Sequence, residues 1–275
     1  MAKSGSRRSI MAVGTSQPAA RADARTERLQ RLRRAVDENG SLHLKAAAQL
    51  LDVSEMTIRR DLAAAETSLA LLGGHVVDAA QPTGAKYTIE QELDHHIQNK
   101  RLACRRATEL LRDGDTVFID CGSTMQVLAD CLPPGLSLSV ICFSMNVAAL
   151  VTTRPATQVI LLGGLYHTSS QSFSSEESLA YLRKLGINKA FISAGGVHPS
   201  RGASCSNFHE VAVKQAAIAT AVESILVIDQ SKLGSLKPAF FAGLDVFGKI
   251  IVGGPVGSET RKRFKSFPMD YAAKG

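Results

Sequence analysis

Residues 42–62 read LHLKAAAQLLDVSEMTIRRDL, and this stretch decides the architecture of the first part of the chain. Residues 45–51 predict a short helix, in which three alanines permit close packing. Asp52 and Val53 form a turn, and Ser54 begins the next helix as its N-cap residue. Two helices joined by a tight turn are typical of a helix-turn-helix, whose second helix contacts base edges of DNA.

The helix after Ser54 has two different faces. At about 100° per residue, one face is apolar and packs on the preceding helices; it consists of Ile58, Leu62 and Ala65. The other side is polar near the helix start, where arginine can bind guanine and hydroxyls can hold phosphates. The residues predicted to contact DNA from this region are Lys45, Ser54, Met56, Thr57, Arg59 and Arg60. Alternatively, Arg59 and Arg60 form a solvated face with Asp61 as their partner.

The flanking sequence supports the DNA-binding interpretation. Leu29, Leu32 and Val36 follow helical spacing and predict a first helix. LLGGHVV at 71–77 predicts a small hairpin after the helix-turn-helix. Residues 1–60 hold 12 Lys and Arg against 6 Asp and Glu, so +6 of the net charge of +7 lies there. A basic N-terminal module beside a near-neutral remainder is the charge distribution expected of a nucleic-acid-binding protein.

Beyond residue 100, short apolar strands alternate with helical patterns along the chain. This alternation predicts an α/β domain built around a mostly parallel sheet. The predicted organisation is a mobile tail at 1–24, a DNA-binding domain at 25–80, a linker and connecting helix at 81–100, an α/β domain at 101–260 and a basic tail at 261–275.

Four predicted strands end in loops rich in small and polar residues. Because parallel strands end at one edge of a sheet, these loops form the crevice where open α/β folds bind ligands. The first loop precedes a helix, whose N-terminus suits a phosphate group. The loop residues predicted to bind an effector are Asp120, Gly122, Ser123, Thr124, Ser144, Asn146, Gly163, Gly164, Asp229 and Lys232. The alternatives are ordinary tight turns, a helix cap at Asn146 and a surface ion pair between Asp229 and Lys232.

Composition excludes several classes of protein. The five cysteines are odd in number, widely spaced and without a C-x-x-C pair, which is typical of reduced thiols inside a cell. No Cys/His cluster has ligand spacing, so we expect neither a metal nor another cofactor. The chain lacks the run of about 18 apolar residues that a membrane span needs and the apolar core of a signal peptide. We expect a cytoplasmic protein.

The motifs at 42–62 and 71–77 together resemble the winged helix-turn-helix of the DeoR family of bacterial repressors. This resemblance implies that Gly73, Gly74 and His75 lie in the wing near the DNA backbone. The strand-end loops resemble the sensor domain of the same family, which is related to ribose-5-phosphate isomerase and glucosamine-6-phosphate deaminase. In that family a DxGST-type loop takes the phosphate. The resemblance also implies that Glu210 and Lys214 line the sugar site, although residues four apart on a helix can simply form an ion pair.

Several short motifs most resemble a family member that represses a deoxyribonucleoside operon. They are CGST at 121–124, SAGGVH at 193–198, GASCSN at 202–207 and DQSKLG at 229–234. This resemblance implies a repressor that binds double-stranded operator DNA. Deoxyribose 5-phosphate is then the effector that releases the repressor from the DNA. The sequence departs from the family at Leu233, where many members have Phe, and in its N-terminal extension. Because one small winged head binds DNA weakly, we expect a homo-oligomer on repeated half-sites.

Two other functions are compatible with the same motifs. A sugar-phosphate isomerase or deaminase with a DNA-binding head would use Glu210 as base and Lys232 to polarise a carbonyl. The loop at 193–197 is Ser-Ala-Gly-Gly-Val, without the acidic residues of the enzymes, which favours binding without turnover. An activator differs from a repressor only in where its operator lies.

Overall fold

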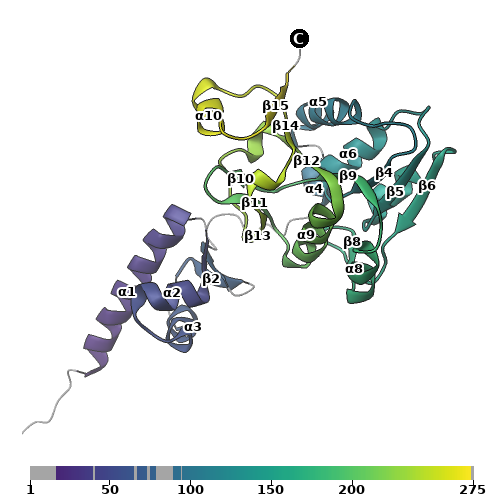
Figure 1. Cartoon of the computed structure of the whole chain (residues 1–275). Helices are drawn as coiled ribbons and strands as arrows, with labels where there is room; N and C mark the ends of the chain where they lie inside the picture. Colours follow the sequence, from purple (N-terminus) through teal and green to yellow (C-terminus); the bar gives the residue numbers. More distant parts are fainter. Residues whose placement is uncertain are drawn as a thin grey trace, which may run out of the picture. The chain divides into compact units, whose positions relative to one another are not determined.

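The computed structural model describes residues 17–39, 41–64, 67–72, 75–78, 89–93 and 95–273. The chain divides into two compact units, residues 1–80 and 81–275 (Figure 1). Residues 81–88 and 94 of the predicted linker and connecting helix, and residues 1–16 of the predicted N-terminal tail, lie outside the described residues. Within that part of the chain, no helix combines the length and apolar character needed to cross a membrane.

The first unit is a helix-turn-helix followed by a β-hairpin. Its elements are α1 (Gln17–Asn39), β1 (Ser41–His43), α2 (Leu44–Leu51), α3 (Glu55–Ala63), β2 (Leu69–Leu72) and β3 (His75–Asp78). The strands form an antiparallel sheet in the order β1-β3-β2. The buried core consists of Leu32, Val36, Leu44, Ala47, Leu51, Ile58, Leu69 and Val76. The predicted winged arrangement and the inward position of Ile58 are therefore present.

Helix α1 begins at Gln17, inside the segment that the sequence predicts as a mobile tail up to residue 24. The segment 17–24 reads QPAARADA and has no amphipathic period, which is why it does not resemble a packed helix. Alanine is the strongest helix former, and Pro18 suits the first turn of a helix. Local propensity therefore extends α1 beyond the part that packs on the core.

The second unit is built on a seven-stranded parallel sheet in the order β15-β14-β12-β9-β4-β5-β6. The strands are β4 (Thr116–Ile119), β5 (Leu138–Cys142), β6 (Thr157–Leu161), β9 (Ile187–Ile192), β12 (Ala221–Asp229), β14 (Lys249–Gly253) and β15 (Met269–Ala272). From β4 the chain builds outward through β5 to β6, and then returns to β9 on the other side of β4. The strand order therefore reverses between β4 and β9, and this reversal is where open α/β sheets bind ligands.

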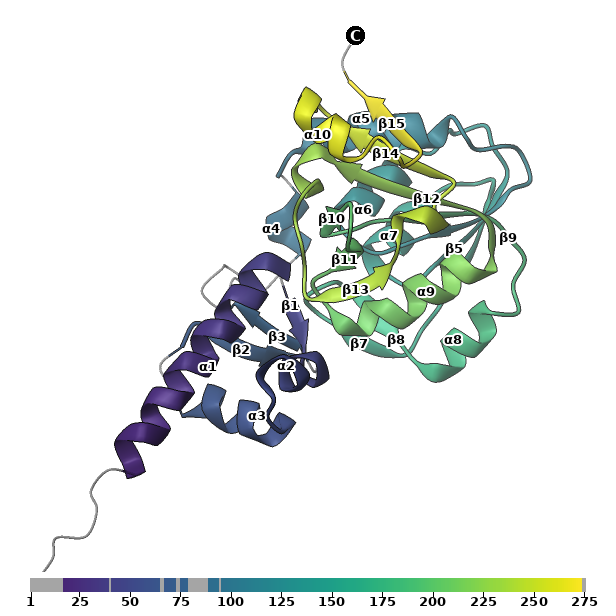
Figure 2. The same ribbon diagram turned by 60° about the vertical axis from the view of Figure 1, so that its left-hand side comes forward.

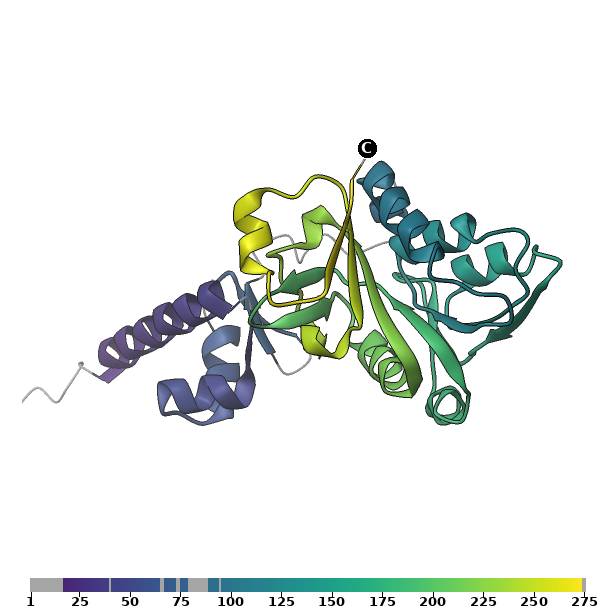
Figure 3. The same cartoon turned by 45° about the horizontal axis from the view of Figure 1, so that its top comes forward.

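Helices cover both faces of this sheet (Figures 2 and 3). One layer consists of α5 (Ile97–Thr108), α6 (Ser123–Cys131) and α7 (Met145–Val151), and the other contains α8 (Glu176–Leu182) and α9 (Val211–Thr220). Side chains alternate between the layers: Val117 and Ile119 of β4 join the first core, and Phe118 joins the second. Because both faces are buried, the strands read as continuous apolar runs.

The structure adds elements that the sequence patterns do not predict. They are the hairpin β7 (Leu165–His167) and β8 (Ser172–Ser174), the antiparallel sheet β10 (Gly196–His198), β11 (Gly202–Cys205) and β13 (Ala239–Ala242), and the short helices η1 (Phe208–Glu210), η2 (Gln230–Lys232) and η3 (Leu244–Val246). Strands of three or four residues are too short to show a period. The short helix α4 (Ile89–Leu93) lies within the predicted linker and connecting helix.

Two predicted boundaries of the α/β domain need correction. The segment 261–275, predicted as a solvated basic tail, contains the end of α10 (Ser258–Arg263) and the edge strand β15. Residues 97–100, predicted as part of a connecting helix, belong to α5, which packs on β12 and β14. The edge strand was not predicted because the basic run at 261–265 precedes it, and charge of this kind is typical of a solvated segment.

Candidate functional site

The start of α3 presents an exposed set of polar and basic side chains. Ser54 caps the helix, and its hydroxyl accepts a hydrogen bond from the Thr57 amide at 3.2 Å. Met56 is 71% exposed, and Arg59 and Arg60 are also exposed. Ser54, Met56, Thr57, Arg59 and Arg60 therefore lie together at the end of the helix that reads bases in helix-turn-helix proteins.

In the solvated-face alternative, Asp61 is the partner of Arg59 and Arg60. In the structure Asp61 has a different partner. Asp61 is buried, and its carboxylate pairs with the Arg28 guanidinium of α1 at 2.7 Å. Among the described residues, neither Arg59 nor Arg60 makes an ion pair. Both guanidinium groups lie on the exposed side of α3.

The remaining predicted DNA contacts are only partly described. Lys45 is exposed at the start of α2. His75 begins β3, and its side chain lies outside the described residues, as do Gly73 and Gly74. Their contact with the DNA backbone therefore stays a prediction.

A polar site lies where the strand order reverses. Asp120 follows β4 and Ser193 follows β9, and both lie at the carboxyl ends of these neighbouring strands. The Asp120 amide donates to the Phe191 carbonyl at 3.1 Å. In return, the Ser193 amide donates to Asp120 Oδ2 at 2.8 Å, and the Ser193 hydroxyl lies 2.8 Å from the same oxygen. These bonds fix the Asp120 carboxylate at the base of the crevice.

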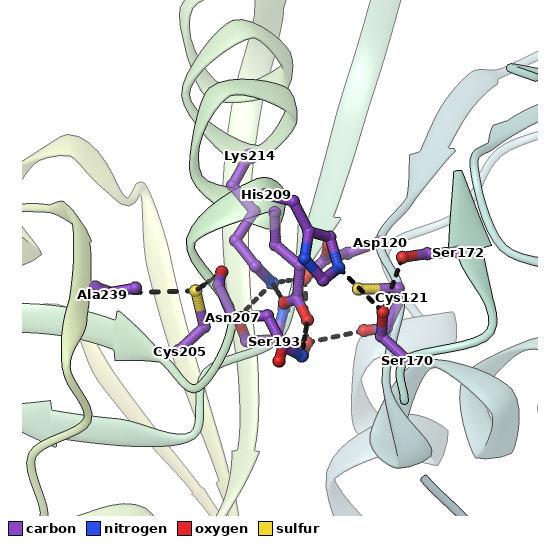
Figure 4. A network of polar contacts seen from close by, with 11 residues as sticks. Asp120, Cys121, Ser170, Ser172, Ser193, Cys205, Asn207, His209, Lys214 and Ala239 are labelled. Atoms are coloured by element: carbon purple, nitrogen blue, oxygen red, sulfur yellow. Dashed lines mark hydrogen bonds and ion pairs between the residues drawn. The ribbon is translucent and has the colours of Figure 1, made fainter. Parts of the chain in front are cut away.

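Lys214 of α9 reaches into the same point and is almost completely buried (Figure 4). Its ammonium pairs with Asp120 and lies 3.5 Å from the Glu210 carboxylate. It also donates to the Ser193 carbonyl at 3.2 Å. Burial by itself lowers the pKa of Lys214, but the adjacent carboxylates outweigh burial and hold this pKa well above its ordinary value. Lys214 is therefore a fixed positive charge that holds two acidic side chains.

Glu210 has a second partner in Asn207, whose amide donates to Glu210 Oε1 at 2.7 Å. One oxygen of the Asp120 carboxylate, Oδ1, is buried with no partner among the described residues. Carboxylate and amide oxygens of this kind accept hydrogen bonds from hydroxyl groups. This end of the site, with Asp120, Asn207 and Glu210, is the acidic end.

The opposite end is basic and contains the start of α6. Gly122 has a φ of 105°, a conformation that glycine tolerates, and it leads directly into the helix N-terminus. Ser123 accepts a hydrogen bond from the buried Lys100 ammonium at 2.9 Å. Lys232 of η2 approaches from the other side, where its ammonium lies 3.1 Å from Glu92 Oε2. Lys100, Lys232 and the helix N-terminus together form the basic end.

The two ends belong to one pocket of about 430 Å³, including its open mouth. Its lining is formed by Glu92, Cys121, Gly122, Ser123, Thr124, Ser193, Ala194, Gly195, Cys205, Ser206, Glu210, Lys214 and Lys232. Of the predicted effector residues, the structure brings Gly122, Ser123, Thr124, Glu210, Lys214 and Lys232 to this lining, with Asp120 directly behind it.

Ser144 and Asn146, which are also predicted effector residues, do not line the pocket. The β7–β8 hairpin folds over the end of β5, where the Phe173 amide donates to the Phe143 carbonyl and the Met145 amide donates to Gln171, each at 2.8 Å. Ser144 is buried beneath it, and the Asn146 amide donates to Gln126 of α6 at 3.1 Å. The hairpin thus covers this loop, and neither predicted residue is among those that line the pocket.

Three further predicted effector residues serve the fold instead of the pocket lining. A Cβ atom on Gly164 would lie 2.4 Å from the Ser174 carbonyl, so glycine is needed for the close approach of the hairpin strands. Gly163 lies in the same turn, where its carbonyl accepts from the Ser178 hydroxyl. Asp229 is buried and caps η2 by accepting from the Ser231 amide at 2.9 Å. It therefore positions Lys232 without reaching the pocket.

Sequence reasoning missed Lys100, Glu92, Ser193 and Asn207 as site residues. Lys100 did carry a signal, because it shares the apolar face of α5 with Ala103, Cys104 and Ala107. A lysine on a buried helix face needs a partner, and such residues are frequently functional. The other three have no such signal, since their positions depend on chain reversals.

A pair of histidines lies beside the acidic end. The rings of His167 and His209 stack with centroids 3.6 Å apart and an interplanar angle of 8°. The Ser170 hydroxyl lies 3.0 Å from His209 Nε2 and 2.8 Å from the Ser172 hydroxyl (Figure 4). Burial and the neighbouring His167 lower the pKa of His209 to about 4. His209 is therefore neutral at pH 7.

This shift predicts a loss of stability in mild acid. The unfolded chain protonates His209 near pH 6.5 and the folded chain only near pH 4, so stability falls as pH drops through this window. We expect the free energy of unfolding to fall between pH 7 and pH 5 by about 1 kcal/mol more in the unaltered chain than in His209→Gln. Urea unfolding at both pH values measures this, and parallel losses in the two proteins would contradict it.

No group of three His, Cys, Asp or Glu side chains within the described ranges is arranged to hold a metal ion. The pocket instead combines fixed charges of both signs with hydroxyl and amide groups. Such an arrangement can bind a polar molecule that carries an anion at one end.

Comparison with known proteins gives two family matches. Residues 28–79 match the DeoR-like helix-turn-helix domain, and residues 95–254 match the DeoR C terminal sensor domain. The chain is 35% identical over 228 residues to the deoxyribose operon repressor of Escherichia coli strain K12, covering 82% of this chain and 90% of that protein. It is 30% identical over 213 residues to the lactose phosphotransferase system repressor of Streptococcus mutans, covering 76% and 84%. Among solved structures, ribose 5 phosphate isomerase A from Neisseria gonorrhoeae has 16% identity, 49% and 53% coverage and a TM-score of 0.37.

Proposed function

Because this chain belongs to the DeoR family of transcription regulators and is not an enzyme, we propose that it is a repressor released from its operator by deoxyribose 5-phosphate. The exposed start of α3 binds the operator, and the pocket at the β4–β9 reversal binds the effector. The genes it controls serve deoxynucleoside or sugar catabolism. Since operator DNA lies in the cytoplasm, the protein acts there.

The observation that carries the effector proposal is the opposite charge of the two ends of the pocket. A sugar phosphate has a dianionic group at one end and hydroxyls at the other. The basic end, with Lys100, Lys232 and the N-terminus of α6, suits the phosphate. The acidic end, with Asp120 and Glu210, suits hydroxyl donors.

Two observations favour deoxyribose 5-phosphate among sugar phosphates. The most similar relative named above is a deoxyribose operon repressor, and its match spans both units of this chain. The motifs around Ser123, Asn207 and Lys232 contribute to the pocket or to its acidic end. A lactose phosphotransferase system repressor is also a relative, so another phosphorylated sugar is the alternative effector.

The test is fluorescence anisotropy of the purified chain on DNA from its own upstream region at fixed salt, because phosphate contacts make DNA affinity salt-dependent. Deoxyribose 5-phosphate is added first and ribose 5-phosphate in a parallel titration. We expect release by the deoxy sugar at lower concentration. Tight DNA binding that neither sugar changes would refute the proposed effector and leave the DNA-binding function in place.

Arg60→Ala is expected to weaken operator binding by about 1–3 kcal/mol, because an arginine bound to a guanine carries sequence discrimination. Arg60 is exposed, makes no ion pair among the described residues and lies near the start of α3. Anisotropy on operator and on random DNA measures the effect. An equal loss on both DNAs would instead make Arg60 a phosphate contact.

We further infer that the chain acts as a homo-oligomer on repeated half-sites. The first unit presents one recognition helix of nine residues, and a single such head gives limited affinity. Sedimentation of the full chain measures the oligomeric state. A monomer that still binds operator tightly would contradict the inference.

A further inference from the structure

Glu92 places a carboxylate inside the pocket at its basic end. Its side chain lies 3.1 Å from the Lys232 ammonium, and both side chains are partly buried. Burial raises the pKa of Glu92, but Lys232 outweighs burial and the pKa lies below its ordinary value. The carboxylate is therefore charged at neutral pH and lies against a lysine that suits a phosphate.

Glu92 is also held through its backbone. The Lys100 ammonium donates both to the Glu92 carbonyl and to the Ser123 hydroxyl at the start of α6. The two lysines of the basic end thus each hold Glu92, one through its side chain and one through its main chain. A phosphate group at the start of α6 would compete with Glu92 for the Lys232 ammonium, which lines the pocket, while the buried Lys100 ammonium adds positive charge behind Ser123.

Charge favours the phosphate in this competition. Lys237 lies close to Lys232, and burial together with the Lys232 charge lowers the pKa of Lys237. Glu92 supplies one negative charge to Lys232, and the buried Asp229 acts on Lys100, whereas a phosphate monoester carries about −1.5 to −2 at pH 7. The phosphate also presents three acceptor oxygens, enough to bind several donors at once.

Glu92 lies on α4, the first described helix of the second unit. Residues 79–88, which join α4 to the first unit along the chain, lie outside the described residues. Ile89 anchors the other end of α4, because its side chain is buried and its amide donates to the Ser169 carbonyl at 3.1 Å. Loss of the Glu92 contacts would leave α4 held through Ile89 and through its packing on α6.

We propose that Glu92 is a built-in occupant of the phosphate subsite, which the effector phosphate displaces so that α4 is freed. The inference rests on the proposed effector function of the same pocket. It assigns this displacement to one carboxylate, Glu92, and to the lysine with which it pairs, Lys232.

The test uses inorganic phosphate and deoxyribose 5-phosphate as probes of the full chain. Isothermal titration calorimetry compares the unaltered chain, Glu92→Gln and Lys232→Met. Glu259→Gln is the matched control, since it removes a carboxylate 2.7 Å from Lys262 on exposed α10. We expect Glu92→Gln to bind inorganic phosphate about 3- to 10-fold more tightly. Lys232→Met should lose binding, and Glu259→Gln should leave it unchanged.

Amide hydrogen exchange over Ile89–Leu93 distinguishes displacement of Glu92 by phosphate from a gain in phosphate affinity that comes only from removing the negative charge of Glu92. Phosphate should speed exchange in the unaltered chain, and Glu92→Gln should exchange fast without it. Equal phosphate affinity in these two proteins, or slower α4 exchange on binding, would overturn the displacement alone. Absence of binding by both probes in every variant would overturn the phosphate subsite and the proposed effector together. Release by a different sugar phosphate with faster α4 exchange would keep the displacement and change only the effector.

Discussion

Lys214→Met is expected to lower the free energy of unfolding of the second unit by about 3–5 kcal/mol, the largest loss of stability that we predict for this chain. Lys214 is buried and neutralises Asp120, which is itself buried. Methionine preserves much of the side-chain volume but removes the ammonium. Two carboxylates, Asp120 and Glu210, then lose their common positive partner. An uncompensated buried charge costs more than the ion pair contributes.

Urea unfolding followed by tyrosine fluorescence measures this loss, because the chain lacks tryptophan and its four tyrosines all lie beyond residue 80. Lys184→Met is the matched control, since Lys184 is exposed after α8 and makes no ion pair among the described residues. The double variant Asp120→Leu with Lys214→Met should recover part of the loss, because it removes the unpaired charge. A loss below about 1 kcal/mol would show that water or rearrangement compensates Asp120.

The helix-turn-helix could be predicted in detail because its signals are local. Ser54 is a strong N-cap residue, and the spacing from Ile58 to Leu62 marks one helix face. The partner that the solvated-face alternative gives to Asp61 was wrong for a non-local reason, since Asp61 pairs with Arg28 of another helix. No pattern within α3 contains that information.

The parallel sheet could also be predicted, since both of its faces are buried and its strands are apolar runs. Its edge could not. The strand β15 follows the basic run of α10, and the strands of the antiparallel sheet have only three or four residues each. These short strands form through backbone pairing between segments that the larger sheet holds side by side. The local sequence of each strand does not predict them.

The pocket was predictable in part for the same reason. Ser123, in the loop after the central strand β4, lines the pocket, and Asp120, which directly follows β4, lies just behind the lining, because the sheet edge dictates their place. Ser144 also follows a strand, but a hairpin covers it. Glu92 lines the pocket and Lys100 lies behind Ser123, both on helices that precede the sheet in sequence, and only the tertiary fold brings them to the basic end.

The double variant Ser123→Ala with Thr124→Val is expected to raise the effector concentration for half-release by at least about 100-fold. Both side chains are more than nine-tenths buried, and both line the basic end of the pocket. A hydrogen bond to a charged group contributes about 1.5–3 kcal/mol, and two such bonds correspond to a factor of about 100 or more. Operator affinity without effector should change less than about twofold, since both residues lie in the second unit.

Anisotropy titrations with deoxyribose 5-phosphate measure both quantities, and circular dichroism checks that the fold is kept. The matched control replaces Ser200 and Thr153, exposed hydroxyl residues outside the pocket, with alanine and valine. Unchanged release would exclude the start of α6 as the phosphate site. A loss of operator binding without effector would mean that these hydroxyls maintain the DNA-binding state. Loss of release alone places them in effector recognition, because a ligand shifts the operator equilibrium only through its differential affinity for the two states.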